Sequence, residues 1–320
     1  VPAERPRHRY AYHAPYRNPR MTTTHRRPSR LRRSWLFLAG ADHDALVEGA
    51  ASGADVLIQE LETFTPPDRR PAARELSERV LAGWREAGIL ASVRVNPLDA
   101  GGIDDLRAAM RGRPDIVMMS YVATPEQVVA LDEAVTRFER EYDIAPGSTE
   151  LVPNIETTLG LVNTMAIARS SPRVSAVLVA TEDMVADMAA ERTRAGRELD
   201  YVRSRFRVEC AAVGVTAIDC PYSYADNEGA ELDMRVSRGL GYQAKAIVNG
   251  QFVPVVNRVL TPTADEVALA RRVIDAFDTA RRESGGRRVA AAVVDGFLAE
   301  VPDYLAAHRL IARATQFGIA

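Results

Sequence analysis

Short apolar runs alternate with longer amphipathic segments along most of the chain. From residue 34 onward, each apolar run has the length of a β-strand, and the segments between the runs have the spacing of helices that bury one face. The eight runs are Ser34–Gly40, Asp55–Leu61, Leu90–Val95, Asp115–Tyr121, Glu150–Glu156, Ser175–Thr181, Val215–Asp219 and Ala244–Asn249. The helical segments include Asp42–Ala51, Pro71–Ala87, Gly102–Arg111, Pro125–Tyr142, Leu159–Ala168 and Leu199–Val213.

This alternation predicts the fold class. Continuous apolar runs joined by helices are typical of a parallel sheet that is covered on both faces. Eight such units in roughly 220 residues fit a (β/α)₈ TIM barrel, which we place at residues 34–258. A doubly wound open sheet is the structural alternative. The absence of a Gly-x-Gly-x-x-Gly motif after the first run counts against that alternative.

The pattern changes after the eighth run. Thr263–Ser284 reads as a long helix with an acidic start and a basic end, as the helix dipole favours. A small strand at Val289–Val294 and a last helix at Val301–Ala314 follow. Residues 259–320 are too few for an independent domain. We therefore predict a C-terminal helical arm or lid that packs on the barrel or on a neighbouring subunit.

The first 33 residues differ in composition from the rest. They carry many arginines, a single acidic residue, Glu4, and no apolar segment of the kind found in a secretory signal. Such a composition predicts a disordered basic leader at residues 1–33. A tail that binds nucleic acid or phosphate is the alternative interpretation.

Net charge and cysteine content exclude several classes of protein. The chain of 320 residues has a formal net charge of −2, and no apolar run approaches the length of a membrane span. We therefore expect neither a nucleic-acid partner nor a membrane partner. The two cysteines, Cys210 and Cys220, have no CxxC or zinc-type spacing, so we predict free thiols. With no signal sequence, we expect a cytoplasmic protein.

Polar side chains follow the predicted strands where the strands end. In a TIM barrel the carboxyl ends of the strands form the mouth that holds the reactive groups. The strand ends of this chain carry Glu60–Thr63, Arg94–Pro97, Ser120 and Tyr121, Glu156, Glu182 and Asp183, Asp219, and Lys245 and Asn249. The set as a whole, with one arginine among several carboxylates, predicts an active site.

Acidic residues at two neighbouring strand ends predict a metal-binding site. Glu156 closes the fifth run, and Glu182 and Asp183 close the sixth, so parallel strands would bring these carboxylates to one rim. Hard divalent cations such as Mg²⁺ prefer oxygen ligands, usually one or two carboxylates completed by substrate and water.

The chain resembles the citrate lyase beta-subunit-like CoA-ester lyases of the HpcH/HpaI aldolase superfamily. The resemblance extends from about Arg33 to Leu310 and rests on short motifs that occur in the family's order and spacing. These are Arg-Ser-Trp-Leu-Phe-Leu-Ala-Gly at 33–40, Ser-Gly-Ala-Asp-Val-Leu-Ile at 52–58, Pro-Pro-Asp at 66–68, Arg-Val-Asn-Pro at 94–97, Ile-Glu-Thr at 155–157, Glu-Asp-Met at 182–184, Arg-Ser-Arg at 203–205, Ala-Ile-Asp at 217–219, Pro-Val-Val-Asn at 254–257 and Val-Asp-Gly at 294–296.

The resemblance implies a function and an assembly. It implies a TIM barrel in a homotrimer or hexamer, with Mg²⁺ held by Glu156 and Asp183. It implies that Arg94 binds the substrate carboxylate or the thioester oxygen. It also implies that a carboxylate on the C-terminal arm of a neighbouring subunit acts as acid and base; the matching residue here is Glu300, where relatives commonly have Asp. The implied chemistry is reversible C–C bond cleavage or formation beside a thioester.

The chain departs from the family pattern around the predicted metal pair. Glu62 keeps the central carboxylate of the second strand end, but Thr63 stands where the family usually has Asp. Tyr121 replaces a usual Lys, and Asn249 stands where a His is usual. Thr181 replaces a small residue just before Glu182 and Asp183. We expect Glu62, Thr181, Glu182, Tyr121 and Asn249, together with Arg94, to contact the substrate.

The leading hypothesis is a Mg²⁺-dependent lyase or synthase that acts on a citryl-, malyl- or citramalyl-CoA-like ester. Alternatives are a CoA-independent 2-oxo acid aldolase, an acyl-CoA thioesterase, or a non-catalytic member of the family.

Overall fold

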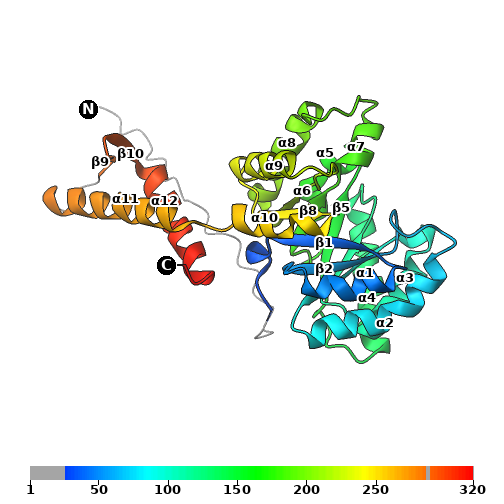
Figure 1. Ribbon diagram of the computed structural model, residues 1–320. Coiled ribbons are helices and arrows are strands. Elements are labelled where there is room, and N and C mark those ends of the chain that lie inside the picture. The colour runs from blue at the N-terminus through cyan, green and yellow to red at the C-terminus, as the bar shows by residue number, and fades with distance from the viewer. Residues whose placement is uncertain (1–25, 286–288, 320) are drawn as a thin grey trace, which may run out of the picture.

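Eight parallel strands form a closed barrel in the computed structural model, which describes residues 26–285 and 289–319 (Figure 1). Each strand pairs with its sequence neighbours, and β8 closes the barrel against β1. The strands are β1 (Ser34–Ala39), β2 (Val56–Glu60), β3 (Leu90–Val95), β4 (Ile116–Met119), β5 (Glu150–Ile155), β6 (Ala176–Val179), β7 (Thr216–Asp219) and β8 (Ala244–Ile247). Every one lies inside a predicted run, so the TIM barrel prediction is confirmed.

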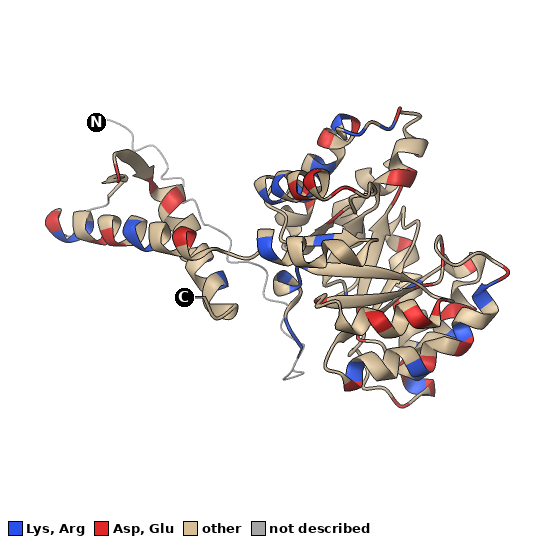
Figure 2. Ribbon diagram, viewed as in Figure 1, with Lys and Arg blue, Asp and Glu red and all other residues tan. Residues whose placement is uncertain are grey.

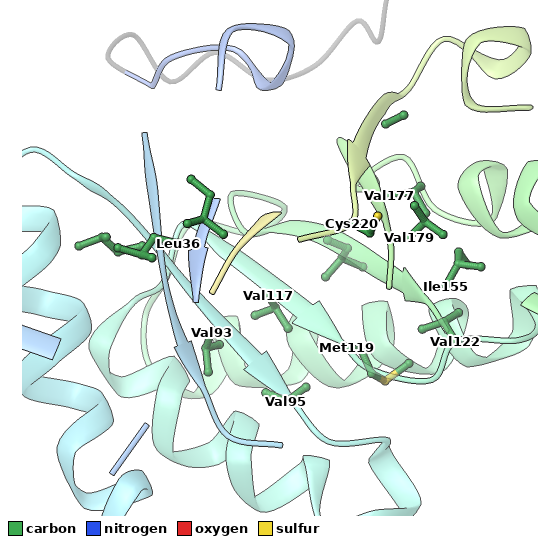
Figure 3. Close-up of a cluster of buried hydrophobic side chains, with 14 of the residues drawn as sticks. Leu36, Val93, Val95, Val117, Met119, Val122, Ile155, Val177, Val179 and Cys220 are labelled. Atoms are coloured by element: carbon green, nitrogen blue, oxygen red, sulfur yellow. The ribbon is translucent and has the colours of Figure 1, made fainter. Parts of the chain in front are cut away.

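Both faces of the barrel are apolar, which explains why the strands read as continuous apolar runs. Alternate side chains, such as Trp35, Ile58 and Met118, form one buried cluster inside the barrel. The residues between them, such as Leu36 and Val117, join a larger cluster with the surrounding helices (Figure 3).

A layer of helices covers the barrel, and charged residues of both signs lie on the helices (Figure 2). The helices are α1 (His43–Glu48), α2 (Arg70–Glu86), α3 (Gly102–Ala109), α4 (Pro125–Glu141), α5 (Thr158–Val162), α6 (Thr164–Arg169), α7 (Thr181–Asp187), α8 (Asp200–Val213), α9 (Asn227–Gly239) and α10 (Val253–Val259). The start of α4 illustrates local control: Thr124 forms a capping box with Gln127, and Pro125 occupies the first turn. None of the helices in the described residues is long and apolar enough to cross a bilayer.

Residues 26–33 are packed against the amino-terminal end of the barrel. Arg32 is buried and forms a double ion pair with Glu150, at 2.5 and 2.7 Å. Arg33 forms a similar pair with Asp55, at 2.9 and 3.0 Å. The disordered leader predicted for residues 1–33 therefore does not include its last eight residues; residues 1–25 lie outside the described part of the chain.

The C-terminal arm stands apart from the barrel in Figure 1. It consists of α11 (Ala264–Glu283), the antiparallel pair β9 (Ala291–Val294) and β10 (Phe297–Glu300), and α12 (Val301–Gln316), with an apolar cluster of its own. The sequence predicted the two helices and β9 but missed β10. The arm touches its own barrel through Arg313, which donates hydrogen bonds to the carbonyls of Arg30 and Leu260 and to the Gln243 side chain. Because Arg30 and Gln243 precede β1 and β8, this contact lies at the end of the barrel opposite the mouth.

Candidate active site

Three charged side chains are buried at the mouth of the barrel. Glu60 is the last residue of β2, its register partner Arg94 lies in β3, and Glu156 follows β5 directly. The exposed fractions are 0%, 7% and 0%, respectively. In each strand these residues lie an even number of positions after apolar side chains that point into the barrel. Because side chains alternate between the two faces of a strand, all three point into the mouth.

Arg94 is held on one side and open on the other. Its Nε lies 2.9 Å from the Glu60 carboxylate, and its Nη2 lies 2.8 Å from Glu60, 2.8 Å from Glu62 and 3.1 Å from the Thr63 hydroxyl. Its Nη1 points toward Glu156 at 3.6 Å, which is beyond hydrogen-bond range. Within the described residues Nη1 donates no hydrogen bond, so this nitrogen is positioned to receive a ligand.

Glu60 is one of the predicted strand-end residues, but the sequence-based assignment gave it no individual role. Its carboxylate accepts three backbone N–H groups, from Glu62, Thr63 and Phe64, in addition to Arg94. Glu60 therefore fixes both the loop after β2 and the guanidinium of Arg94. An acidic residue at the last position of a strand was the available signal.

Glu156 is a buried carboxyl without a hydrogen-bond partner. Neither of its oxygens is bonded within the described residues. Burial raises its pKa to about 8; the Arg94 charge and the nearby Asn154 side chain oppose this effect, and the charges of Glu62 and Asp183 add to it. An unpaired buried carboxylate close to two other carboxylates is the environment that a bound cation would stabilise.

Tyr121 is bonded to Asp183, one member of the metal pair predicted from the sequence. Its hydroxyl donates a 2.8 Å hydrogen bond to Asp183 Oδ1. The pKa of this phenol is raised by partial burial, by that bond, and by the negative charges of Asp183, Glu156 and Glu62. Its backbone φ is +53°, a left-handed conformation that is uncommon outside glycine. Strained backbone of this kind is frequent at functional sites.

The other predicted substrate contacts divide into two groups. Glu62, a predicted contact, lies at the mouth on Arg94, and so does Thr63, for which no substrate contact was predicted. Glu182 is bound by Ser223 and by Arg192, the latter at 3.0 Å, and Asn249 caps the short turn Gly250–Phe252 by accepting from Gln251 N. Thr181 is buried at the start of α7.

Asp219 and Lys245 do not face the mouth, contrary to expectation. They are register partners on the outer face of β7 and β8, where Lys245 Nζ lies 2.8 Å from Asp219 and 2.5 Å from Asp233 of α9. Arg203 of α8 completes this buried group. Its positive charge and that of Lys245 hold the pKa of Asp219 well below its usual range. The cluster therefore connects the barrel to its helices.

Glu300 lies on the arm and not at the mouth of its own barrel. It is exposed, ends β10, and forms a capping box with Asp303 at the start of α12. The arm contacts the opposite end of the barrel (Figure 1). Participation of Glu300 in catalysis thus requires a neighbouring subunit, which leaves the prediction from the resemblance as a proposal.

The donor set fits a magnesium ion. Among the described residues no cluster of three or more His, Cys, Asp or Glu side chains has the arrangement of a complete metal site. Mg²⁺ does not need one, because it is commonly bound by one or two carboxylates with water and substrate completing the shell. The mouth offers Glu156, with both oxygens unpaired, and the free oxygen of Asp183, with Tyr121 orienting the other.

Comparisons with known proteins identify the family. The sequence profile of the HpcH/HpaI aldolase/citrate lyase family matches residues 33–249. The citrate lyase subunit beta of Escherichia coli (strain K12) is 31% identical over 295 residues, covering 92% of this chain and 96% of that protein. The L-malyl-CoA/beta-methylmalyl-CoA lyase of Cereibacter sphaeroides (strain ATCC 17029 / ATH 2.4.9) is 28% identical over 310 residues, covering 90% of this chain and 96% of that protein.

A solved structure agrees with these relatives. The citrate lyase beta subunit of M. tuberculosis, complexed with oxaloacetate and magnesium, has a TM-score of 0.61 at 25% identity and covers 72% of this chain and 97% of its own. The family match spans most of the chain, and the sequence relatives extend over both the barrel and the arm. The chain therefore belongs to the HpcH/HpaI aldolase/citrate lyase family.

Proposed function

We propose that the protein is a Mg²⁺-dependent carbon–carbon lyase that reversibly cleaves a 3-hydroxyacyl-CoA ester into an acyl-CoA and a 2-oxo acid. As a member of this family the protein is an enzyme of the carbon–carbon lyase class. The observation that carries the metal-dependent reaction is Glu156, a buried carboxylate with no hydrogen-bond partner, beside Asp183 and opposite the open nitrogen of Arg94. The M. tuberculosis structure, complexed with oxaloacetate and magnesium, supports a site of the same kind here, for Mg²⁺ and a 2-oxo acid.

Each residue of the mouth has a distinct task. Glu156 and Asp183 would hold Mg²⁺, and the bound ion would supply Lewis-acid polarisation of the carbonyl oxygen of the 2-oxo acid. Arg94 offers Nη1 to the substrate carboxylate or to the thioester oxygen, where negative charge develops. Glu60 keeps the guanidinium in place during this step, because it holds the opposite edge of Arg94.

The bond changes balance without a further reactant. In cleavage, the bond breaks between the hydroxyl-bearing carbon and the carbon next to the thioester. The hydroxyl proton passes to a base, and the oxygen–carbon pair becomes the carbonyl of the 2-oxo acid. The electrons of the broken bond move to the thioester enolate, which then takes up a proton to give the acyl-CoA.

Glu300 from a neighbouring subunit is the acid–base group in this proposal. The carboxylate is exposed at the tip of the arm, away from its own mouth. Large apolar side chains beside it are also exposed, with Val293 at 69%, Leu298 at 63% and Phe297 at 42%. A neighbouring barrel would cover these side chains and bring Glu300 to its mouth, as in a homotrimer or hexamer.

Space for the rest of a CoA ester lies next to the mouth. A cavity of about 450 Å³ opens between the loops that follow β1 and β2, lined by residues such as Ala41, His43, Phe64 and Arg69. Both loops are at the carboxyl ends of their strands, so the cavity is on the same side of the barrel as Arg94.

Citryl-, malyl- and citramalyl-CoA should be tested for release of a 2-oxo acid, trapped as its phenylhydrazone, with Mg²⁺ and with EDTA. Glu156→Gln and Asp183→Asn should abolish the release. Asp187→Asn is the matched control, since Asp187 lies on α7 four residues after Asp183 but accepts from Thr158 N and Oγ1. Full activity in both metal-pair variants would refute the metal assignment.

The same assay separates the alternatives. A thioesterase would release free CoA thiol without any 2-oxo acid, and a CoA-independent aldolase would act on free 2-oxo acids alone. A non-catalytic member would convert none of the esters.

A further inference from the structure

Among residues 26–285 and 289–319, the mouth has one cationic donor that can receive a substrate anion, namely Arg94 Nη1. The other two nitrogens of this guanidinium are occupied by Glu60, Glu62 and Thr63. Any carboxylate of the substrate that does not bind the metal must therefore compete for a single nitrogen.

Apart from Arg69, which lines the neighbouring cavity between the loops after β1 and β2, several basic side chains of the surrounding elements are engaged elsewhere. Arg192 binds Glu182 and lies on the ring of Tyr224. Arg70 donates to the carbonyls of Thr65 and Glu62. Lys245, the single lysine of the chain, is buried on the outer face of the barrel. None of these groups is free to neutralise a second anion at the mouth.

The position over the metal pair carries a neutral group. Tyr121 lies there, bonded to Asp183 and facing the charges of Glu156 and Glu62. The mouth thus holds four carboxylates (Glu60, Glu62, Glu156 and Asp183) and one guanidinium, so even with a bound divalent cation these groups sum to a net negative charge. A second carboxylate on the substrate would add repulsion without a partner.

Apolar side chains also line the mouth, next to these charged groups. Phe37 of β1 lies under Arg94, with 5.2 Å between the guanidinium carbon and the ring centre. Ala180 after β6 is buried in the interior cluster, and Val248 after β8 packs against it. A hydrogen or a methyl group on the 2-oxo acid would find apolar contact here, whereas a carboxylate would lose its hydration.

We propose that this enzyme is selective for 2-oxo acids with a single carboxylate, of the glyoxylate and pyruvate type, over dicarboxylates of the oxaloacetate type. The ester that it cleaves then carries one free carboxylate besides the thioester, as a malyl or citramalyl ester does and a citryl ester does not. This inference rests on the proposed function, since it concerns the acid that binds beside Mg²⁺.

The test is calorimetric titration of the Mg²⁺-loaded protein with glyoxylate, pyruvate, freshly dissolved oxaloacetate and, as a stable dicarboxylate, 2-oxoglutarate. We expect the monocarboxylates to bind at least about tenfold more tightly, because an unpaired desolvated carboxylate weakens binding by this order. Equal or tighter binding of oxaloacetate would overturn the selectivity and leave the proposed function intact. Absence of binding by every acid would overturn both.

Two substitutions of Tyr121 test whether the lack of a cation at this position causes the preference for monocarboxylates. Tyr121→Lys places a cation over the metal pair and should narrow the preference by improving dicarboxylate binding. Tyr121→Phe, the control, adds no charge and should retain the wild-type preference. An unchanged preference in a folded Tyr121→Lys protein would contradict the assignment of selectivity to the missing cation.

Discussion

Glu156→Gln should stabilise the metal-free protein, although it removes a residue of the active site. The wild-type carboxyl is almost fully buried without a hydrogen bond, and its pKa is raised from 4.5 to about 8. This difference corresponds to about 5 kcal/mol between the two protonation states. The pKa of Glu156 is higher in the folded state than in the unfolded state. The free energy of unfolding is therefore undiminished below pH 4.5 and falls as the pH rises toward 8.

The size of the effect therefore depends on pH. Linkage predicts that Glu156 lowers the free energy of unfolding by about 3 kcal/mol at pH 7 and about 5 kcal/mol at pH 9, with little effect at pH 5. Glutamine has nearly the same shape and carries no charge, so the variant should regain most of this energy. Chemical denaturation in EDTA at the three pH values, with Asp187→Asn as control, measures the difference.

Magnesium gives the second half of this test. A cation that binds Glu156 in the folded state raises the thermal midpoint of the wild type by mass action and should not raise that of the variant. The reasoning is refuted if wild type and variant show the same pH dependence of unfolding in EDTA. It is also refuted if Mg²⁺ stabilises both equally.

Three further outcomes are expected. Arg94→Ala should lower kcat/KM by about 10²–10³-fold through loss of charge stabilisation, and retention of wild-type kcat/KM would exclude Arg94 from the reaction. Arg32→Ala should lower the free energy of unfolding by about 3–5 kcal/mol, since it removes the guanidinium that is paired with the buried Glu150, and denaturant titration measures this loss. Burial raises the thiol pKa of Cys220 to about 12 and that of Cys210 higher still, so Ellman's reagent should label neither thiol until the protein is unfolded.

The strands were predictable because a closed parallel barrel buries both faces of every strand. Each strand then appears as an unbroken apolar run, and helix signals between the runs make the βα order readable. β10 escaped prediction because its apolar residues are mostly exposed and it pairs with β9 alone. Nothing in Phe297–Glu300 distinguishes such a strand from a turn.

The sequence did not show which strand-end side chains point into the mouth and which point toward the helices. Glu60 and Asp219 both end strands, yet Glu60 faces the mouth and Asp219 faces the helices. When both faces of a strand are apolar, the sequence pattern does not distinguish inward from outward positions. Only the register of the closed barrel then decides which residues point inward. The pairing of Arg94 with Glu60 depends on this register.

The amino-acid sequence by itself determined the order of the elements, the family, and the acidic residues Glu156 and Asp183 that follow the fifth and sixth strands. Local patterns and motifs carry this information, because each depends on residues close together in the chain. Only the tertiary structure decided that Glu156 is unpaired, that Arg94 keeps one nitrogen free, and that Tyr121 lies against Asp183. These are distances between residues far apart in sequence, and barrel closure sets them.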